Sequence, residues 1–488
     1  MKLAQILVYW LVIAAAPHAS GFDNIESWAD ELIEPAIASG RANGVSIGLV
    51  ENGEVAFLKA YGWEDEDRQI PLDPHASVFR MCSISKSFIA TAIMQLIEQG
   101  QIKSLDDPVN QYLKRLQLPP PHGGDVTLRQ LMTHSAGMAG HAQPQGTTLD
   151  LPVPMSEAEV GQYFLESIET VPGTHSQYAN LGVSLQGVVI EDVTGKELSA
   201  HLADSIFAPL GMSQSLLHYS MTTPERLAVP YGRFPNGELL AVPFYPKHPL
   251  GAASGGVMST TADMLKYAAF HADETGVLYP DVLAGPLRAE MHRPHFRNSD
   301  AHDGVGLHFF PATFGNTRTA SHGCGLPGTN SYLVVMPDIN AALVISVLAG
   351  SNPPLLADLF DMWREQGRYD PAGEFYDLDL LGSGELYRAF AEEYLGEPQR
   401  PSITSDSFDP KAVTDVEEQV GTYWTERRSF TTPMVMLSMA SVREVARSGD
   451  ELEMGGKRFK ALAPGIYEQT ESGARIAFRR PWEGAPVF

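Results

Sequence analysis

The sequence predicts an α+β protein in which a large domain of antiparallel sheet flanked by helices precedes a small antiparallel β domain. Residues 24–38 carry apolar side chains at helical spacing, and a β-hairpin pattern follows at 45–60. A strand–turn–strand pattern over 331–348 brings the chain back to a sheet, and short strands separated by glycine-containing turns begin at 421. The chain shows no repeat of fixed period.

The length of 488 residues exceeds what one hydrophobic core usually serves, so we expect more than one domain. The expected parts are a signal peptide at 1–20, a large domain at 24–350, a linker with helical pieces at 351–411 and a small β-rich domain at 412–488. Lys2 before the apolar run 3–16 is typical of a secretory signal, although an uncleaved N-terminal anchor stays open. We therefore expect a periplasmic or secreted protein.

The elements of the large domain follow from periodicity and from end signals. Asn52-Gly53 favours a type I′ turn inside the hairpin. The next helix is expected over 83–100, where it stops at a glycine. A mainly helical insertion spans about 105–220, and Thr260-Thr261 can cap a later helix.

The C-terminal part reads as a small meander or barrel. Its expected strands are 421–429, 451–454, 457–462, 465–469 and 475–479.

Composition excludes several classes of protein. The formal net charge of -25 opposes binding to nucleic acid or to an anionic membrane surface. Only two cysteines are present, which excludes a disulfide-rich scaffold and a four-cysteine zinc site. The chain has no Walker loop, Rossmann fingerprint or His-Glu-x-x-His motif, so we expect no cofactor and no metal. A Gly-x-Ser-x-Gly motif is also missing, which disfavours an α/β-hydrolase.

Ser83-Ile84-Ser85-Lys86 is a Ser-x-x-Lys motif at the start of a predicted helix. A helix start offers free backbone N–H groups, and one helical turn places Lys86 beside Ser83. A desolvated lysine there can activate a serine hydroxyl for nucleophilic attack. The alternative is an N-capping serine with a surface lysine.

Tyr178-Ala179-Asn180 lies where a loop should enter a helix. The tyrosine can carry a proton, and the amide of Asn180 can hold a substrate carbonyl. A buried structural tyrosine is the alternative.

The glycine-rich stretch 322–328 precedes an apolar strand. Its glycines, Gly323 and Gly325 among them, would let a substrate approach the backbone, with His322 pointing into a cleft. Alternatively, the glycines form an ordinary turn.

In this order the three motifs resemble the family that contains class C β-lactamases, penicillin-binding-protein-like D-amino peptidases and family VIII esterases. The stretches 79–81, 131–138 and 255–263 resemble the same family, and the likeness covers about 24–350. The fold implied is that of the β-lactamases and transpeptidases. The strand region from Val420 resembles lipocalin-like appendages of some members.

The resemblance implies a role for each matching residue. Ser83 would be the acylated nucleophile, Lys86 and Tyr178 the proton-handling pair, and Asn180 a polarising side chain. His322 takes the place of a lysine in true β-lactamases, and a histidine is neutral for much of the physiological range, so we expect little lactamase activity. The oxyanion would lie between the backbone N–H groups of Ser83 and Gly325.

Cys324 departs from the family pattern, which has glycine there. Cys82 directly precedes the nucleophile, and certain class A carbapenemases are similar in bridging a cysteine before the serine to one past the third motif. The resemblance thus implies a Cys82–Cys324 disulfide, with two small buried thiols as the alternative.

Together these features predict a serine hydrolase that cleaves an ester or amide bond in a small molecule or peptide. A carboxylesterase and a D-amino-acid peptidase are both compatible with the motifs. A β-lactamase, or a binding protein that has lost turnover on the same fold, are the alternatives. The oligomeric state is left open by the sequence.

Overall fold

A computed structural model provides the structure of the protein. It describes residues 21–118, 124–138, 168, 170–217, 225–233, 239–242, 249–298, 302–326, 328–349 and 381–399, and strands between 421 and 477. The predicted signal peptide and most of the predicted linker lie outside the described residues.

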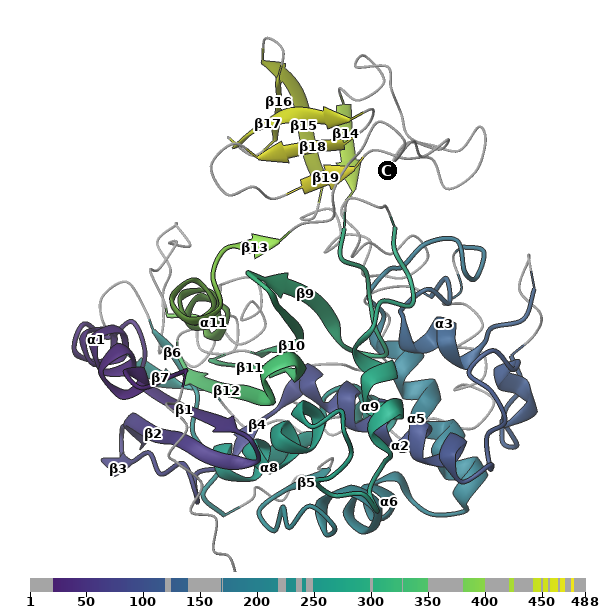
Figure 1. Cartoon of the computed structure of the whole chain (residues 1–488), viewed down its shortest axis with the longest axis horizontal. Coiled ribbons are helices and arrows are strands. Elements are labelled where there is room, and N and C mark those ends of the chain that lie inside the picture. Colours follow the sequence, from purple (N-terminus) through teal and green to yellow (C-terminus); the bar gives the residue numbers. More distant parts are fainter. Residues whose placement is uncertain are drawn as a thin grey trace, which may run out of the picture.

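The main sheet has eight strands among the described residues, and all neighbours pair antiparallel (Figure 1). Their order is β13 (Pro398–Gln399), β9 (Phe310–Phe314), β10 (Thr317–Leu326), β11 (Thr329–Met336), β12 (Ala341–Leu348), β1 (Gly44–Glu51), β2 (Glu54–Asp65) and β3 (Ile70–Pro71). β1 pairs with β12, so the first and last long strands of the large domain meet inside one sheet.

The β1–β2 hairpin has the turn that its sequence predicts. Asn52 and Gly53 have φ values of 52° and 82°. Positive φ at both central positions is the requirement of a type I′ turn, which explains the Asn-Gly pair.

Both faces of the sheet are covered by helices. Alternate residues of β12 point to opposite faces: Leu343 and Ile345 pack with α1 (Ile25–Ala38) and α11 (Ser383–Phe390), whereas Val344 packs with α8 (Thr261–Ala272). α11 lies in the stretch predicted as a linker with helical pieces, and its Phe390 is fully buried in the core of the large domain.

The remaining helices form the region that flanks the sheet on the α8 side (Figure 1). They are η1 (Cys82–Ile84), α2 (Ser85–Glu98), η2 (Val109–Gln111), α3 (Leu128–Met132), α5 (Asn180–Thr194), α6 (Leu198–Leu202), η3 (Ala203–Phe207), α7 (Pro249–Gly255) and α9 (Gly285–His292). Two short helices, η4 (Pro337–Ile339) and η6 (Ala391–Leu395), belong to the sheet side. The side chains of α2 are buried from Ser85 to Leu96, so this helix runs through the core.

Two small sheets complete the large domain. One has the order β4 (Phe79–Arg80), β8 (Val257–Ser259), β5 (Leu216–Leu217), and the other pairs β6 (Tyr231–Arg233) with β7 (Leu239–Ala241).

The C-terminal residues form a separate six-stranded antiparallel meander among the described strands. The strands, in sheet order, are β14 (Gly421–Trp424), β15 (Val442–Ser448), β16 (Glu451–Met454), β17 (Lys457–Ala463), β18 (Ile466–Gln469) and β19 (Arg475–Ala477). β15 was missing from the sequence prediction.

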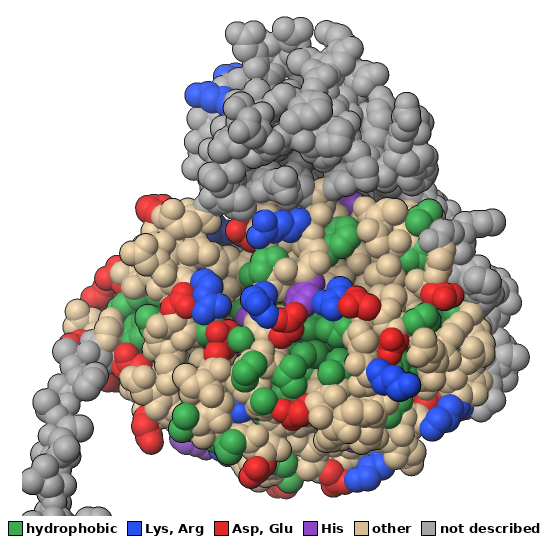
Figure 2. All heavy atoms as spheres, turned by 45° about the vertical axis from the view of Figure 1, so that its right-hand side comes forward, with side chains coloured by type: hydrophobic (Ala, Val, Ile, Leu, Met, Phe, Trp, Pro, Cys, Tyr) green, Lys and Arg blue, Asp and Glu red, His purple; other side chains and the backbone are tan. Residues whose placement is uncertain are grey.

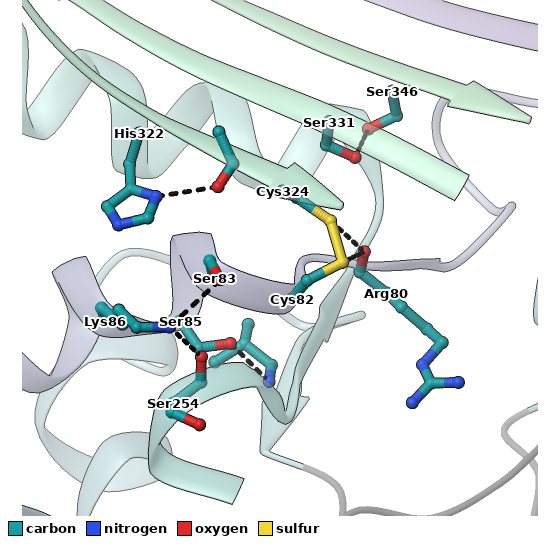
Figure 3. The surroundings of a disulfide bond; sticks show 12 residues. Arg80, Cys82, Ser83, Ser85, Lys86, Ser254, His322, Cys324, Ser331 and Ser346 are labelled. Atoms are coloured by element: carbon teal, nitrogen blue, oxygen red, sulfur yellow. Dashed lines mark hydrogen bonds between the residues drawn. A yellow bond between two sulfur atoms is a disulfide. The ribbon is translucent and has the colours of Figure 1, made fainter. Parts of the chain in front are cut away.

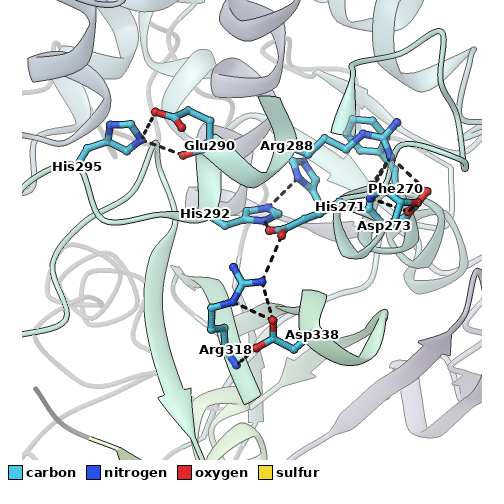
Figure 4. Close-up of polar contacts among 11 residues, drawn as sticks. Phe270, His271, Asp273, Arg288, Glu290, His292, His295, Arg318 and Asp338 are labelled. Carbon is cyan, nitrogen blue, oxygen red and sulfur yellow. Dashed lines mark hydrogen bonds and ion pairs between the residues drawn. The ribbon is translucent and has the colours of Figure 1, made fainter. Parts of the chain in front are cut away.

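A chain of polar side chains connects the interior of the large domain to its surface (Figure 4). His271 Nδ1 lies 3.1 Å from His292 Nε2, and His292 Nδ1 lies 2.9 Å from Glu274 Oε1. Arg318 then bonds both Glu274, at 3.3 Å, and Asp338, at 2.6 Å. Burial lowers the pKa of both histidines, so the two rings are neutral at neutral pH.

The surface carries charges of both signs. On the face seen in Figure 2, acidic side chains lie among Lys and Arg side chains. Within the described residues, no helix combines the length and the apolar character needed to cross a membrane.

Candidate active site

The nucleophile candidate Ser83 lies in η1, in the turn between β4 and α2. Cys82, the residue before it, has a φ of 39°, in the left-handed region that non-glycine residues rarely adopt. Such strain persists only where the surrounding structure fixes it, and it is often found at functional sites. Because η1 occupies Cys82–Ile84, helix α2 begins at Ser85 and not at Ser83, where the sequence predicted its start.

Lys86 is the second residue of α2, and its side chain reaches back to Ser83 (Figure 3). Its Nζ donates to Ser83 Oγ at 3.1 Å and to the backbone oxygen of Ser254 at 2.7 Å. Lys86 is 0% exposed, so the alternative of a surface lysine is wrong. A buried amine at this distance can accept the hydroxyl proton when the serine attacks.

Tyr178 ends the loop that enters α5, as its motif predicted. Asn180 is the first residue of α5 and Ala179 is its N-cap, while the ring centroid of Tyr178 lies 4.9 Å from Lys86 Nζ. The structure thus brings the Ser83, Lys86 and Tyr178 candidates together, and half-buried Asn180 follows at the start of α5.

His322, Gly323 and Gly325 lie inside strand β10, not in a turn that precedes a strand. β9 pairs with β10 only as far as Ser321, so among the described residues the β9-facing edge of β10 has no strand partner from His322 onward. An extended substrate can lie along such an edge.

The His322 side chain is 2% exposed and lies close to the other candidates. Its Nδ1 is 2.8 Å from the backbone oxygen of Gly323, and its ring centroid is 6.3 Å from that of Tyr178. Phe310 of β9 packs on the same imidazole, with 5.3 Å between centroids.

Cys82 and Cys324 form a disulfide, with their Cα atoms 5.1 Å apart (Figure 3). Of the two alternatives left by the sequence, the structure has the bonded one. Both sulfur atoms also contact the backbone oxygen of Arg80, at 3.3 and 3.5 Å. The extra side chain at Cys324 is therefore directed to the nucleophile turn.

Two further histidines pack against the site, and motif reasoning gave them no role. His134 stacks beside Tyr178 at 4.5 Å between ring centroids, and His308 lies 4.9 Å behind His134. The signal for His134 was the stretch 131–138, used above only for the resemblance. No sequence pattern singled out His308.

Burial holds the pKa of His308 well below its ordinary value, and electrostatic interactions with His134, Lys86 and His322 lower this pKa further. The ring is therefore neutral next to the lysine. In the described part of the chain, no three His, Cys, Asp or Glu side chains are grouped so as to hold a metal ion.

An antiparallel sheet covered by helices, with a buried Ser-Lys pair at a helix start, defines the class of serine hydrolases that share the β-lactamase/transpeptidase fold. The Beta-lactamase family model matches residues 29–363. The chain belongs to the beta-lactamase family of serine hydrolases.

Similar proteins agree with this assignment. The "Putative penicillin-binding protein PbpX" of Bacillus subtilis strain 168 is 28% identical over 284 residues, which are 58% of this chain and 64% of that protein. The chain thus spans less than two thirds of the length of this relative.

Solved structures show the same fold. An octameric penicillin-binding protein homologue from Pyrococcus abyssi matches with a TM-score of 0.59 at 20% identity, over 93% of this chain and 95% of that one. A D-amino acid amidase from Ochrobactrum anthropi SV3, complexed with L-phenylalanine amide, matches with a TM-score of 0.57 at 23% identity, over 76% and 98%.

Proposed function

We propose that the protein is an exported serine hydrolase that cleaves an ester or amide bond through an acyl-enzyme at Ser83. The observation that carries this proposal is the 3.1 Å contact between Ser83 Oγ and the fully buried Lys86 Nζ. A capping serine has no need of a buried amine beside it, whereas a nucleophile needs a base within hydrogen-bond distance.

The reaction proceeds in two halves. Ser83 Oγ forms a bond to the carbonyl carbon and gives its proton to Lys86 or Tyr178, while the carbonyl electron pair moves to the oxygen. Collapse of this oxyanion breaks the bond to the leaving alkoxide or amine, which takes up a proton from the same pair. Water then attacks the acyl-enzyme in the same manner and releases the acid.

The oxyanion would be held by the backbone N–H groups of Ser83 and Gly325. Asn180 would polarise the acyl group, and the substrate would lie along the edge of β10 that has no strand partner from His322 onward among the described residues. A silent binding protein is disfavoured, because the chain retains Ser83, Lys86, Tyr178 and Asn180, and the first three lie close together.

We favour a carboxylesterase or a D-amino-acid peptidase over a β-lactamase, because His322 stands where a lysine would bind a β-lactam carboxylate. The likeness in fold to a D-amino acid amidase supports an amide substrate. A substrate panel should show turnover of D-amino-acid amides or nitrophenyl esters and little turnover of a chromogenic cephalosporin. Preferential cephalosporin hydrolysis would contradict this choice.

Export is supported by the apolar run 3–16 after Lys2 and by the Cys82–Cys324 disulfide, since such bonds persist in oxidising compartments. Amino-terminal sequencing of the protein from the periplasm or the medium would test export and the cleavage site together.

The decisive test is the intact mass after incubation with a fluorophosphonate. Wild type should gain one adduct and Ser83→Ala should gain none. Ser87→Ala is the matched control: its hydroxyl lies on the same helix and donates to Ile84 O at 2.7 Å, so this variant should still be labelled. Folded wild type without an adduct would contradict the proposal.

A further inference from the structure

The loop that carries Tyr178 is hydrogen-bonded to residues 133–135 of the helical region, and its Ser176 backbone is also bonded to the side chain of Asn298. The bonds run from Gly173 N to Ser135 O at 2.7 Å, from Ser176 Oγ to Thr133 O at 2.8 Å, from Gln177 N to His134 O at 2.8 Å and from Ala179 N to His134 Nδ1 at 3.2 Å. The backbone N–H groups of the residues before and after Tyr178, Gln177 and Ala179, are therefore both bonded to a single residue, His134.

The His134 side chain also touches the phenol ring itself. The two ring centroids are 4.5 Å apart, with 36° between the planes. Because Nδ1 accepts the Ala179 N–H, the proton of a neutral His134 must lie on Nε2. His134 has a φ of 57°, and this left-handed conformation aims its ring at the Tyr178 loop.

His308 supports His134 from behind. It is 0% exposed, also has a φ of 57°, and its backbone N–H donates to Met132 O at 3.1 Å. Its Nε2 is hydrogen-bonded to the side-chain amide of Gln186 at 3.0 Å. The depressed pKa of His308 keeps this ring neutral, so His308 supports His134 without adding a charge near Lys86.

We propose that His134, backed by His308, is a positioning residue that holds the Tyr178 phenol against Lys86 and Ser83. This inference rests on the proposed function, because the orientation of the phenol matters only if Ser83 is acylated. A misplacement of a catalytic group by about 1 Å can cost about 100-fold in rate. The bonds to the loop and the ring contact together restrict such movement.

The test uses two substitutions in the full-length chain. His134→Phe keeps a ring and removes the acceptor, while His134→Asn keeps an acceptor, tolerates positive φ and removes the ring. With a nitrophenyl ester, either change should lower kcat about 10- to 100-fold and leave KM within about twofold. Rates of fluorophosphonate labelling at Ser83 should fall in parallel.

A double-mutant cycle separates positioning from general damage. In a Tyr178→Phe background, either change at His134 should lower kcat by less than about twofold, because the group that His134 positions is already gone. His201→Phe is the matched control: His201 is a buried histidine on α6, and its replacement should leave kcat unchanged.

Each other outcome overturns the inference. His134 would not position Tyr178 if its substitution lowered kcat equally in the wild-type and Tyr178→Phe backgrounds, or if a folded variant kept its kcat. Failure of both His134 variants to fold would give His134 a purely structural role. Failure of the proposed function is seen separately, since wild type itself would then carry no adduct at Ser83.

Discussion

The Lys86 side chain is wholly buried, and its Nζ lies within hydrogen-bond distance of Ser83 Oγ and Ser254 O. Replacing it with methionine fills a similar volume and removes the base. In the Lys86→Met variant, the rate at which a fluorophosphonate labels Ser83 should therefore be about 100- to 10,000-fold lower than in wild type, the range typical of a lost general base. Labelling time courses followed by mass spectrometry measure this rate.

A labelling rate of Lys86→Met close to that of wild type would contradict this prediction. If folded Lys86→Met were labelled within about tenfold of the wild-type rate, Tyr178 alone would suffice as the base. Circular dichroism would show that the variant is folded.

For individual residues, the sequence predicted most of the site. Ser83 and Lys86 are one helical turn apart, so local geometry alone brings them together. His134 and His308 were missed as functional residues because their contact depends on tertiary structure, and because positive φ at a histidine leaves no periodic signal.

At the scale of elements, the Cys82–Cys324 bond joins η1 to β10 across a sequence separation of 242 residues. The double substitution of both cysteines by alanine should lower the free energy of unfolding by about 2–5 kcal/mol, since long closed loops restrict the unfolded chain most. Urea unfolding without reductant measures the loss. Reduced wild type should show a similar loss, and equal stability of all three samples would contradict the prediction.

Elements with strong end signals were predicted closely. α1, the Asn52-Gly53 hairpin and α8 all lie where expected, and Thr260 Oγ1 accepts the Asp263 N–H at 3.2 Å as the cap of α8. β9 was not predicted, because Pro311 removes a backbone donor and breaks the strand pattern. The place of His322 inside β10 was also left open, since a glycine cluster resembles a turn until its partner strand is known.

For the whole molecule, pH should affect stability through buried histidines. Burial lowers the pKa of five histidines: His201, His271, His292, His295 and His308. For His295 the pKa falls to about 4. Below their ordinary pKa of about 6.5 the unfolded chain takes up protons that the folded protein does not. The stability present above about pH 6.5 should therefore be lost as the pH falls towards about 4.

Denaturant unfolding over this pH range tests the prediction. His295→Gln should flatten the dependence by up to about 1.4 kcal/mol per pH unit, the contribution of one proton. A free energy of unfolding that stays constant from about pH 7 to about pH 5 would contradict it.

The packing of α11 predicts where the large domain can be shortened. A chain that ends after residue 399 keeps Leu386 and Phe390, which are 1% and 0% exposed, and should still be labelled at Ser83. A chain that ends after residue 350 loses α11 and leaves its sheet face covered by α1 alone, so it should aggregate or melt earlier. Phe390→Ala in the full chain should cost about 3–5 kcal/mol. Loss of labelling in the chain that ends after residue 399 would show that the C-terminal meander supports the site.

The disulfide also changes how the molecule would respond to a protease. Cys82 and Cys324 lie on opposite sides of the whole inserted helical region, so a single cut anywhere between them leaves two fragments covalently attached. Nicked protein would migrate as one band on a non-reducing gel and as two after reduction. In an environment rich in proteases, the halves that carry Ser83 and His322 would remain attached after such a cut.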